Sequence, residues 1–203
     1  MPTFFMYICN NMEILSLWGV DGPKIIQPLI FKDDRGYFFE SFNEGKFKEE
    51  VANVDFVQDN ESKSSYGVLR GLHFQKPPFA QAKLVRVING AVFDVAVDIR
   101  EGSPTYGKWC GAYLSSENHR QFFIPRGFAH GFVSLANDTV FQYKCDNTYN
   151  KESEGSIAYN DPYINIDWGS WLDWHNIKLS DKDQMSPLLK DIKNVFKYED
   201  TEI

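Results

Sequence analysis

The chain has 203 residues, 43% hydrophobic and 24% charged, which is typical of a soluble globular protein and excludes the disordered and fibrous classes. Its formal net charge of -7 argues against binding to duplex nucleic acid, because neutralising phosphates requires a surplus of Lys and Arg. Its three cysteines are widely spaced and include no Cys-x-x-Cys pair, so we expect reduced, cytoplasmic thiols and neither a disulfide framework nor a thiolate zinc site.

The chain is expected to form one domain, residues 12–203, after a short N-terminal extension, residues 1–11. The extension begins with apolar residues but has no positively charged region and no clear cleavage site, so we interpret it as something other than a signal peptide. No linker, repeat or low-complexity tract divides the rest of the chain. No stretch approaches the length of a membrane span, and we expect no membrane partner.

Short β-type runs separated by Gly, Pro, Asn and Asp extend from about residue 24 to residue 168, and this spacing predicts a sandwich or a barrel. Helical signals are few. Asn43 is a candidate N-cap for a short helix over residues 45–51. Ser180 is a candidate N-cap for a C-terminal helix over residues 181–196, with Pro187 either in its first turns or interrupting it.

One turn can be interpreted more closely. Asn89 and Gly90 lie between two β runs, which is the strongest short-range signal for a two-residue hairpin. Such a hairpin would pair Val85 with Asp94 and make Lys83 a diagonal neighbour of Asp94, on a face otherwise composed of Val and Ala. Two interpretations of this charge pair stay open: an ion pair inside a mostly apolar cavity, or a surface ion pair on a half-exposed sheet.

Two of the four histidines, His73 and His130, lie in glycine-containing segments, RGLHFQ and PRGFAHGF. Imidazole is the side chain best suited to take up and return a proton near neutral pH, although a lone His among apolar residues is more often structural. A metal-binding barrel of the cupin type carries a His-x-His pair. Here Gly71 and Gln75 stand two positions before and after His73, so we expect no zinc or iron.

The remaining candidate groups are ambiguous when taken one at a time. Tyr143 lies in the β run TVFQYKC, where a phenol can serve as a general acid but more often packs. Asp181 and Asp183 stand at the expected start of a helix, where capping is the simpler interpretation. No Gly-x-Ser-x-Gly, Walker loop or Gly-x-Gly-x-x-Gly occurs, which disfavours α/β hydrolases, P-loop enzymes and dinucleotide-binding dehydrogenases.

Together, the order and spacing of the sequence blocks resemble the dTDP-4-dehydrorhamnose 3,5-epimerases. The blocks are DDRGYFFESF, FVQDNESKS, GVLRGLHFQ, QAKLVRVINGAVFDVAVDIREGSPTYGKW, LSSENHRQFFIPRGFAHGF, FQYKCDNTY, NDPYINIDW and LSDKD. The resemblance covers most of the chain from about residue 13. It implies a cupin-type double-stranded β-helix, or jelly-roll barrel, with a few short helices and no metal or other cofactor. It also implies a homodimer that epimerises a dTDP-4-keto-6-deoxyhexose at C3 and C5, in the pathway to dTDP-L-rhamnose.

The resemblance implies a role for each matching residue. His73 matches the base, paired with Asp183, to which Asp181 is a nearby competitor. Tyr143 matches the acid on the opposite face of the sugar, and Lys83 matches the cation near the developing enolate oxygen. The other implied contacts are Arg70 and Tyr149 at the diphosphate, Gln58 and Asn60 on the nucleotide side, Asp94 and His130 lining the site, and Arg35, Phe38 and Glu40 in a segment that reaches into the partner subunit's pocket.

One local conflict accompanies this assignment. Strict strand alternation would send Arg70 and His73 to opposite faces of a strand, so we expect Gly71 to mark a bulge or a bend.

Three alternatives compete with the double epimerase. A sister enzyme would epimerise only C3 or only C5, or move the ketone as a ketoisomerase. A non-catalytic carbohydrate-binding module would also use aromatic residues but has no need of a base, an acid and a buried cation together. A metal-dependent cupin oxygenase is disfavoured by the missing His-x-His pair.

Overall fold

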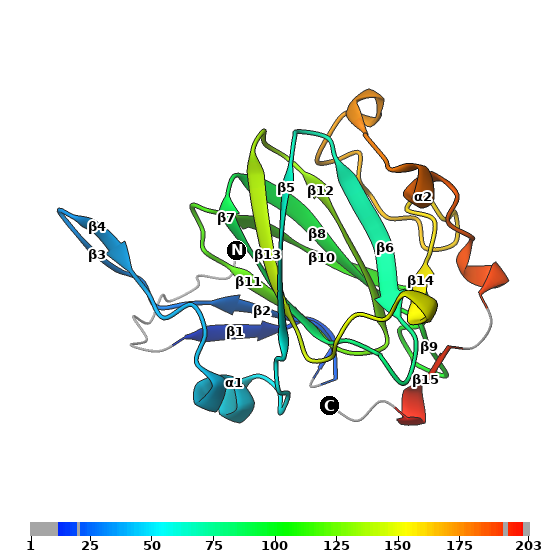
Figure 1. Ribbon diagram of the computed structural model, residues 1–203, viewed down its shortest axis with the longest axis horizontal. Helices are drawn as coiled ribbons and strands as arrows, with labels where there is room; N and C mark the ends of the chain where they lie inside the picture. Colours follow the sequence, from blue (N-terminus) through cyan, green and yellow to red (C-terminus); the bar gives the residue numbers. More distant parts are fainter. Residues whose placement is uncertain (1–11, 20, 193–194, 201–203) are drawn as a thin grey trace, which may run out of the picture.

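The computed structural model describes residues 12–19, 21–192 and 195–200, so the extension expected over residues 1–11 lies outside the described residues. The described chain is mainly β with a few short helices, as the sequence predicted. Two antiparallel sheets face each other across the body of the molecule (Figure 1), which is the two-layer arrangement of a jelly roll.

The larger sheet has six strands in the order β1-β2-β11-β7-β13-β5, and the smaller sheet has five in the order β10-β8-β12-β6-β14. The bounds in the larger sheet are β1 Glu13–Ser16, β2 Lys24–Gln27, β11 Gln121–Ile124, β7 Lys83–Asn89, β13 Thr139–Cys145 and β5 Gln58–Ser64. Those in the smaller sheet are β10 Trp109–Ser115, β8 Ala91–Asp98, β12 Phe128–Ser134, β6 Leu69–Gln75 and β14 Glu154–Ser156. Within the described ranges no strand pairing joins the two sheets, so the expected barrel is open.

Two short ribbons complete the strands. β3, Phe31–Asp33, pairs with β4, Gly36–Phe38, in a hairpin that projects away from both sheets (Figure 1). β15, Phe196–Lys197, runs parallel to β9, Arg100–Glu101, and ties the C-terminal segment to the body.

Apolar side chains from both sheets fill the space between them. Burying aliphatic and aromatic side chains of this size contributes about 1.5 to 3 kcal/mol each, so this layer is a main source of stability. Its buried members are Val85, Val87, Phe122, Ile124 and Phe141 from the larger sheet, with Val92, Ala96, Ala112, Leu114, Phe128 and Phe132 from the smaller.

Separate layers cover the outer faces of the two sheets. The segment from Ile157 to Leu189 packs on the outer face of the smaller sheet, where Trp168 is fully buried beside Phe93. Helix α1, Glu44–Glu50, packs Phe47 on Phe123 of the larger sheet. Polar side chains from both sheets gather in one part of the interior, where a cavity opens.

The hairpin predicted at Asn89 and Gly90 is wrong. β7 pairs with β11 and β13, and β8 pairs with β10 and β12, so this turn carries the chain from one sheet to the other. Gly90 has a φ of +83°, which glycine adopts without steric cost, so an Asn-Gly pair suits a turn between two sheets as well as a hairpin turn. Both strands are central in their sheets and need partners on both sides. The inward face was nevertheless predicted correctly, because Val85 and Val92 both point into the shared core.

The two helix predictions had different outcomes. Asn43 caps α1, with its side chain accepting a hydrogen bond from the Lys46 backbone N at 3.1 Å. Ser180 caps helix α2, but α2 spans only Asp181–Gln184, so the predicted helix over residues 181–196 is wrong beyond its first turn. Pro187 explains the early end, because proline lacks an N–H and forces the preceding residue out of the helical region.

The bulge predicted at Gly71 is confirmed. On β12, His130 stands opposite His73 and Phe132 stands opposite Arg70, so two residues of β6 face a single residue of β12. Gly71 has a φ of +130°, and a Cβ there would meet Gly131 Cα at 2.5 Å. The extra residue turns Arg70 and His73 toward the same cavity.

Candidate active site

A cavity of about 440 Å³ opens between the two sheets and has the size of a small-molecule site. The smaller sheet, the larger sheet and the segment before α2 each contribute to its wall. Six of the residues predicted for the site line it: Arg70, His73, Lys83, His130, Tyr143 and Asp183. The others that line it are Glu61, Ser62, Val68, Leu69, Phe132, Phe141, Lys178, Leu179 and Ser180.

His73 forms a hydrogen-bonded pair with Asp183. His73 Nε2 lies 2.6 Å from Asp183 Oδ1, and Ser180 Oγ donates to the other carboxylate oxygen at 2.7 Å. Burial alone would raise the pKa of Asp183, but the hydrogen bonds from His73 and Ser180 hold that pKa below its ordinary value. An ionised carboxylate only accepts hydrogen bonds, so Nε2 carries the hydrogen and Nδ1 is left as the proton acceptor. Asp181, the competing carboxylate, is exposed.

Lys83 and Tyr143 come from adjacent strands of the larger sheet, β7 and β13. Lys83 Nζ lies 5.9 Å from the centroid of the Tyr143 ring. Desolvation lowers the pKa of Lys83, opposed by the nearby Cys145 and Asp94. Desolvation raises the pKa of Tyr143, so its phenol keeps its proton near neutral pH. The protonated phenol of Tyr143 and the side chain of Lys83 therefore stand on one wall of the cavity, and the imidazole of His73 stands on the other.

His130 and Asp94 form a second, deeper pair. His130 Nε2 lies 2.9 Å from Asp94 Oδ1, and Asp94 is fully buried. Burial raises the pKa of Asp94, opposed by His130 and Lys83, and burial lowers the pKa of His130. The interpretation of Lys83 and Asp94 as a surface ion pair is therefore wrong. Asp94 lies in the interior, hydrogen-bonded to His130, and acts on Lys83 at longer range.

Gln58 and Asn60, predicted for the nucleotide side, form a hydrogen-bonded cluster with Tyr149, predicted for the diphosphate. Gln58 Oε1 accepts a hydrogen bond from the Tyr149 backbone N at 3.0 Å, and Gln58 Nε2 donates to Asn60 Oδ1 at 3.0 Å. Tyr149 is largely exposed. Arg70 is also exposed, and its Nε donates to Ser64 Oγ at 3.2 Å.

Sequence reasoning missed two charged residues next to this cluster. Lys182 forms an ion pair with Glu154 of β14, and Tyr149 Oη donates to the same carboxylate at 3.3 Å. Lys182 lies between Asp181 and Asp183 in the LSDKD block, and this position in a block with predicted site residues could have identified it. Nothing in the sequence around Glu154 distinguishes it, because β14 is only three residues long.

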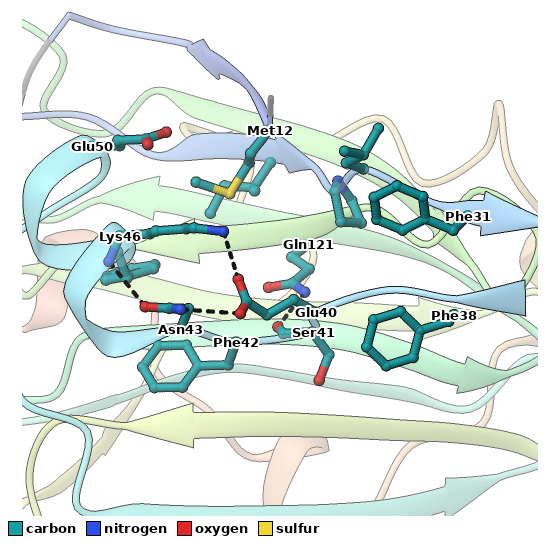
Figure 2. A pocket seen from close by; sticks show the side chains of 14 residues that line it. Met12, Phe31, Phe38, Glu40, Ser41, Phe42, Asn43, Lys46, Glu50 and Gln121 are labelled. Atoms are coloured by element: carbon teal, nitrogen blue, oxygen red, sulfur yellow. Dashed lines mark hydrogen bonds and ion pairs between the residues drawn. The ribbon is translucent and has the colours of Figure 1, made fainter. Parts of the chain in front are cut away.

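The three residues predicted to act in a partner's pocket do not line the cavity of their own chain. Arg35 pairs with Asp33 in the turn of the projecting hairpin. Phe38 and Glu40 line a separate pocket of about 280 Å³ at the base of that hairpin (Figure 2). In this pocket Glu40 accepts hydrogen bonds from Asn43 Nδ2 at 3.0 Å and from Lys46 Nζ at 2.9 Å.

Neither a metal-ligand cluster nor a membrane span is found in the part of the chain that the structure describes. No three His, Cys, Asp or Glu side chains gather there in an arrangement that could hold a metal ion. None of the helices there is both long enough and apolar enough to cross a bilayer.

Comparisons with known proteins agree on one family. A family model described as dTDP-4-dehydrorhamnose 3,5-epimerase matches residues 18–191. The epimerase of that name from Salmonella typhimurium is 55% identical over 180 residues, covering 88% of this chain and 96% of the relative. The solved epimerase from Legionella pneumophila, in complex with dTDP-4-keto-L-rhamnose, superposes with a TM-score of 0.87 at 49% identity, covering 93% of this chain and 99% of that one. A 3'-monoepimerase from Streptomyces bikiniensis, in complex with dTDP-quinovose, superposes with a TM-score of 0.82 at 30% identity, covering 91% of this chain and 94% of that one.

Proposed function

The chain belongs to the dTDP-4-dehydrorhamnose 3,5-epimerase family of isomerases, and we propose that His73, Lys83 and Tyr143 carry out the family's reaction in the cavity between the sheets. The reaction converts dTDP-4-dehydro-6-deoxy-D-glucose to dTDP-4-dehydro-L-rhamnose. C3 and C5 of this sugar both neighbour the C4 ketone. Removing a proton from either carbon therefore gives an enolate, whose negative charge resides on the C4 oxygen.

His73 is the base. Its Nδ1 takes the proton from the carbon, and the Asp183 carboxylate at 2.6 Å stabilises the imidazolium that forms and holds the ring in one orientation. Ser180 keeps Asp183 in place through two hydrogen bonds: its Oγ accepts from the Asp183 backbone N and donates to the Asp183 carboxylate.

Lys83 stabilises the enolate, and Tyr143 returns the proton. An ammonium held in a desolvated cavity attracts a developing oxyanion much more strongly than it would in water. Tyr143 belongs to the sheet opposite His73, so its phenol donates to the other face of the sugar ring. Inversion requires this second group, because a base acting alone tends to return the proton to the face from which it came.

The single observation that carries this proposal is the opposition of acid and base. The imidazole lies on the smaller sheet, the phenol lies on the larger one, and both line one cavity into which the Lys83 ammonium also extends. A sugar-binding module has no use for this arrangement.

We also propose that two copies form a homodimer in which the projecting hairpin, with Arg35, Phe38 and Glu40, reaches the partner's cavity. The support is the exposure of three large side chains on the hairpin: Phe31 at 58%, Tyr37 at 58% and Phe38 at 70%. An isolated two-stranded hairpin is only marginally stable in water, and a cluster of exposed aromatic side chains marks a contact surface.

The test is incubation with dTDP-4-keto-6-deoxyglucose in D₂O, with deuterium followed at C3 and C5. Label at both carbons, together with the inverted product, is the expected result. Label at one carbon selects the monoepimerase or ketoisomerase alternative. The monoepimerase is the better supported of the two, because the chain is similar to the 3'-monoepimerase from Streptomyces bikiniensis. The absence of label at both carbons would contradict the proposed function.

A further inference from the structure

Ser62 Oγ is the one buried side-chain nitrogen or oxygen atom without a hydrogen-bond partner among the residues that the structure describes. Buried polar atoms nearly always find a partner, so an exception needs an explanation. Ser62 also lines the cavity between the sheets, next to the proposed catalytic groups. The unpaired hydroxyl therefore belongs to the place where a ligand binds.

The neighbours of Ser62 on its own strand are all engaged elsewhere. The inward positions of β5 are Gln58, Asn60, Ser62 and Ser64, which alternate with exposed residues. Gln58 binds Asn60 and the backbone of Tyr149, and Asn60 Nδ2 lies 3.7 Å from a cysteine sulfur. Ser64 Oγ accepts the hydrogen bond from Arg70. Ser62 alone in this row has no partner.

The residue directly opposite Ser62 on the neighbouring strand offers it only carbon. This cross-strand partner on β13 is Phe141, whose ring stacks on Phe132 with the centroids 4.1 Å apart. A phenyl ring cannot replace a lost hydrogen bond to water. The polar partner of Ser62 must therefore come from the contents of the cavity.

We infer that Ser62 is a substrate-binding residue whose hydroxyl forms a hydrogen bond with an oxygen of the sugar ring or its substituents. A serine hydroxyl donates one hydrogen bond and accepts two, so it fits a sugar hydroxyl or a ketone equally. Ser62 lies four positions along β5 from Gln58, about 13 Å away, and so contacts the sugar half of the ligand and not the nucleotide half. This inference rests on the proposed function.

The proposal also predicts how removing the Ser62 hydroxyl affects the stability of the folded protein. Because no described protein group pairs with this hydroxyl, its removal breaks no hydrogen bond within the protein, whereas removing a hydroxyl that is paired with another protein group destabilises the folded state. Ser115 provides the matched control, since it is also buried on a strand, its Oγ accepts from the Asn118 backbone N at 3.1 Å, and it does not line the cavity.

The experiment measures the melting temperature and the affinities for dTDP and dTDP-glucose of the wild type, Ser62→Ala, Ser62→Thr and Ser115→Ala. Ser62→Ala is expected to bind dTDP-glucose about tenfold more weakly, to bind dTDP as the wild type does, and to melt no lower. Ser62→Thr keeps a hydroxyl and should restore the affinity for dTDP-glucose. Ser115→Ala should melt lower, with both affinities unchanged.

Three outcomes would overturn the inference: wild-type affinity of Ser62→Ala for dTDP-glucose, an equal loss for both ligands, or a lowered melting temperature without a change in affinity. In each of these the wild type still binds dTDP-glucose, so the proposed function stands. A wild type that binds neither ligand would instead contradict the proposed function, and this inference with it.

Discussion

His73 Nε2 lies 2.6 Å from Asp183 Oδ1, although the two residues are 110 positions apart in the chain. One belongs to a central strand of the smaller sheet and the other to a helix of four residues near the C-terminus. This contact joins an interior strand of the sheet to one of the shortest helices of the described chain.

Replacing the base should stop the reaction while leaving the fold intact. His73→Asn is expected to lower kcat by at least about 10²- to 10⁴-fold, because it removes the base and the other imidazole of that wall, His130, is the buried hydrogen-bond partner of Asp94. Asp183→Asn keeps the shape of the side chain but loses its charge, so it should lower kcat by a smaller factor. Asp181→Asn is the control for Asp183→Asn and should retain wild-type kcat, since Asp181 is exposed. A His73→Asn variant with near-normal turnover would contradict the assignment.

The Asp183 carboxylate should also contribute to stability in a pH-dependent way. Its folded-state pKa lies below its ordinary value of 3.8, so the unfolded chain binds more protons in this range and stability rises with pH. The contribution is fully present above about pH 4 to 5 and is lost as the pH falls through the folded-state pKa. Urea midpoints measured from pH 6 to pH 2 should show a steeper acid decline for the wild type than for Asp183→Asn. Parallel curves would contradict the depressed pKa.

Removing the phenol should separate proton exchange from inversion. In Tyr143→Phe, His73 still removes a proton and exchanges it with solvent, but no acid stands on the opposite face. Deuterium from D₂O should therefore enter the starting sugar with its configuration retained, and the L-rhamno product should be lost. NMR of the recovered sugar nucleotide distinguishes the two effects. Normal inversion by Tyr143→Phe would mean that another residue is the acid.

The charge of Lys83 should act mainly on kcat. Lys83→Met keeps the length and removes the ammonium, and should lower kcat by about 10²- to 10³-fold, as expected for one oxyanion-stabilising group. Desolvation lowers the pKa of Lys83 from 10.5, so wild-type activity should fall on the alkaline side below that pH as the ammonium loses its proton. The pKa of Tyr143 is raised, so its phenol stays protonated there. Lys83→Arg, which keeps its charge, should lack the alkaline decline.

The projecting hairpin should act across the dimer. Phe38→Ser damages the hairpin but leaves the cavity intact, whereas His73→Asn does the reverse. In mixed dimers the hairpin of the His73→Asn chain can complete the cavity of the Phe38→Ser chain, restoring about a quarter of the wild-type sites at equal mixing. Activity assays after exchange of subunits check this. If the mixture is no more active than its components, the hairpin does not serve the partner.

Local chemistry in the sequence was enough to predict individual elements. Asn43 caps its helix, because that requirement is met by one residue and its immediate neighbours. The bulge at Gly71 could be predicted only after the family resemblance had placed Arg70 and His73 in one site. The turn at Asn89 and Gly90 shows the limit. The Asn-Gly pair specifies a tight turn with a positive φ at Gly90, but it does not specify whether the two flanking strands pair with each other. They do not pair here, because each is an interior strand with two other partners in its own sheet.

The site residues could likewise be predicted one by one, but their arrangement could not. His73, Lys83 and Tyr143 were singled out from residue type and family resemblance, but their convergence depends on how the two sheets face each other. Glu154 was missed because its three-residue strand carries no pattern. Ser62 was missed because an unpaired hydroxyl is a property of the surrounding fold and cannot be seen in a run of alternating polar residues.

The position of Asp183 on α2, outside both sheets, has a consequence for how the protein is made. All strands of the two sheets end by Ser156, so a chain emerging from the ribosome completes its sheets before the aspartate becomes available. His73 would then lack its carboxylate partner until the segment from Ile157 to Leu189 had packed on the smaller sheet. A nascent chain would thus form its two sheets first and complete the His73–Asp183 pair last, so that turnover would begin only after the C-terminal segment had been synthesised.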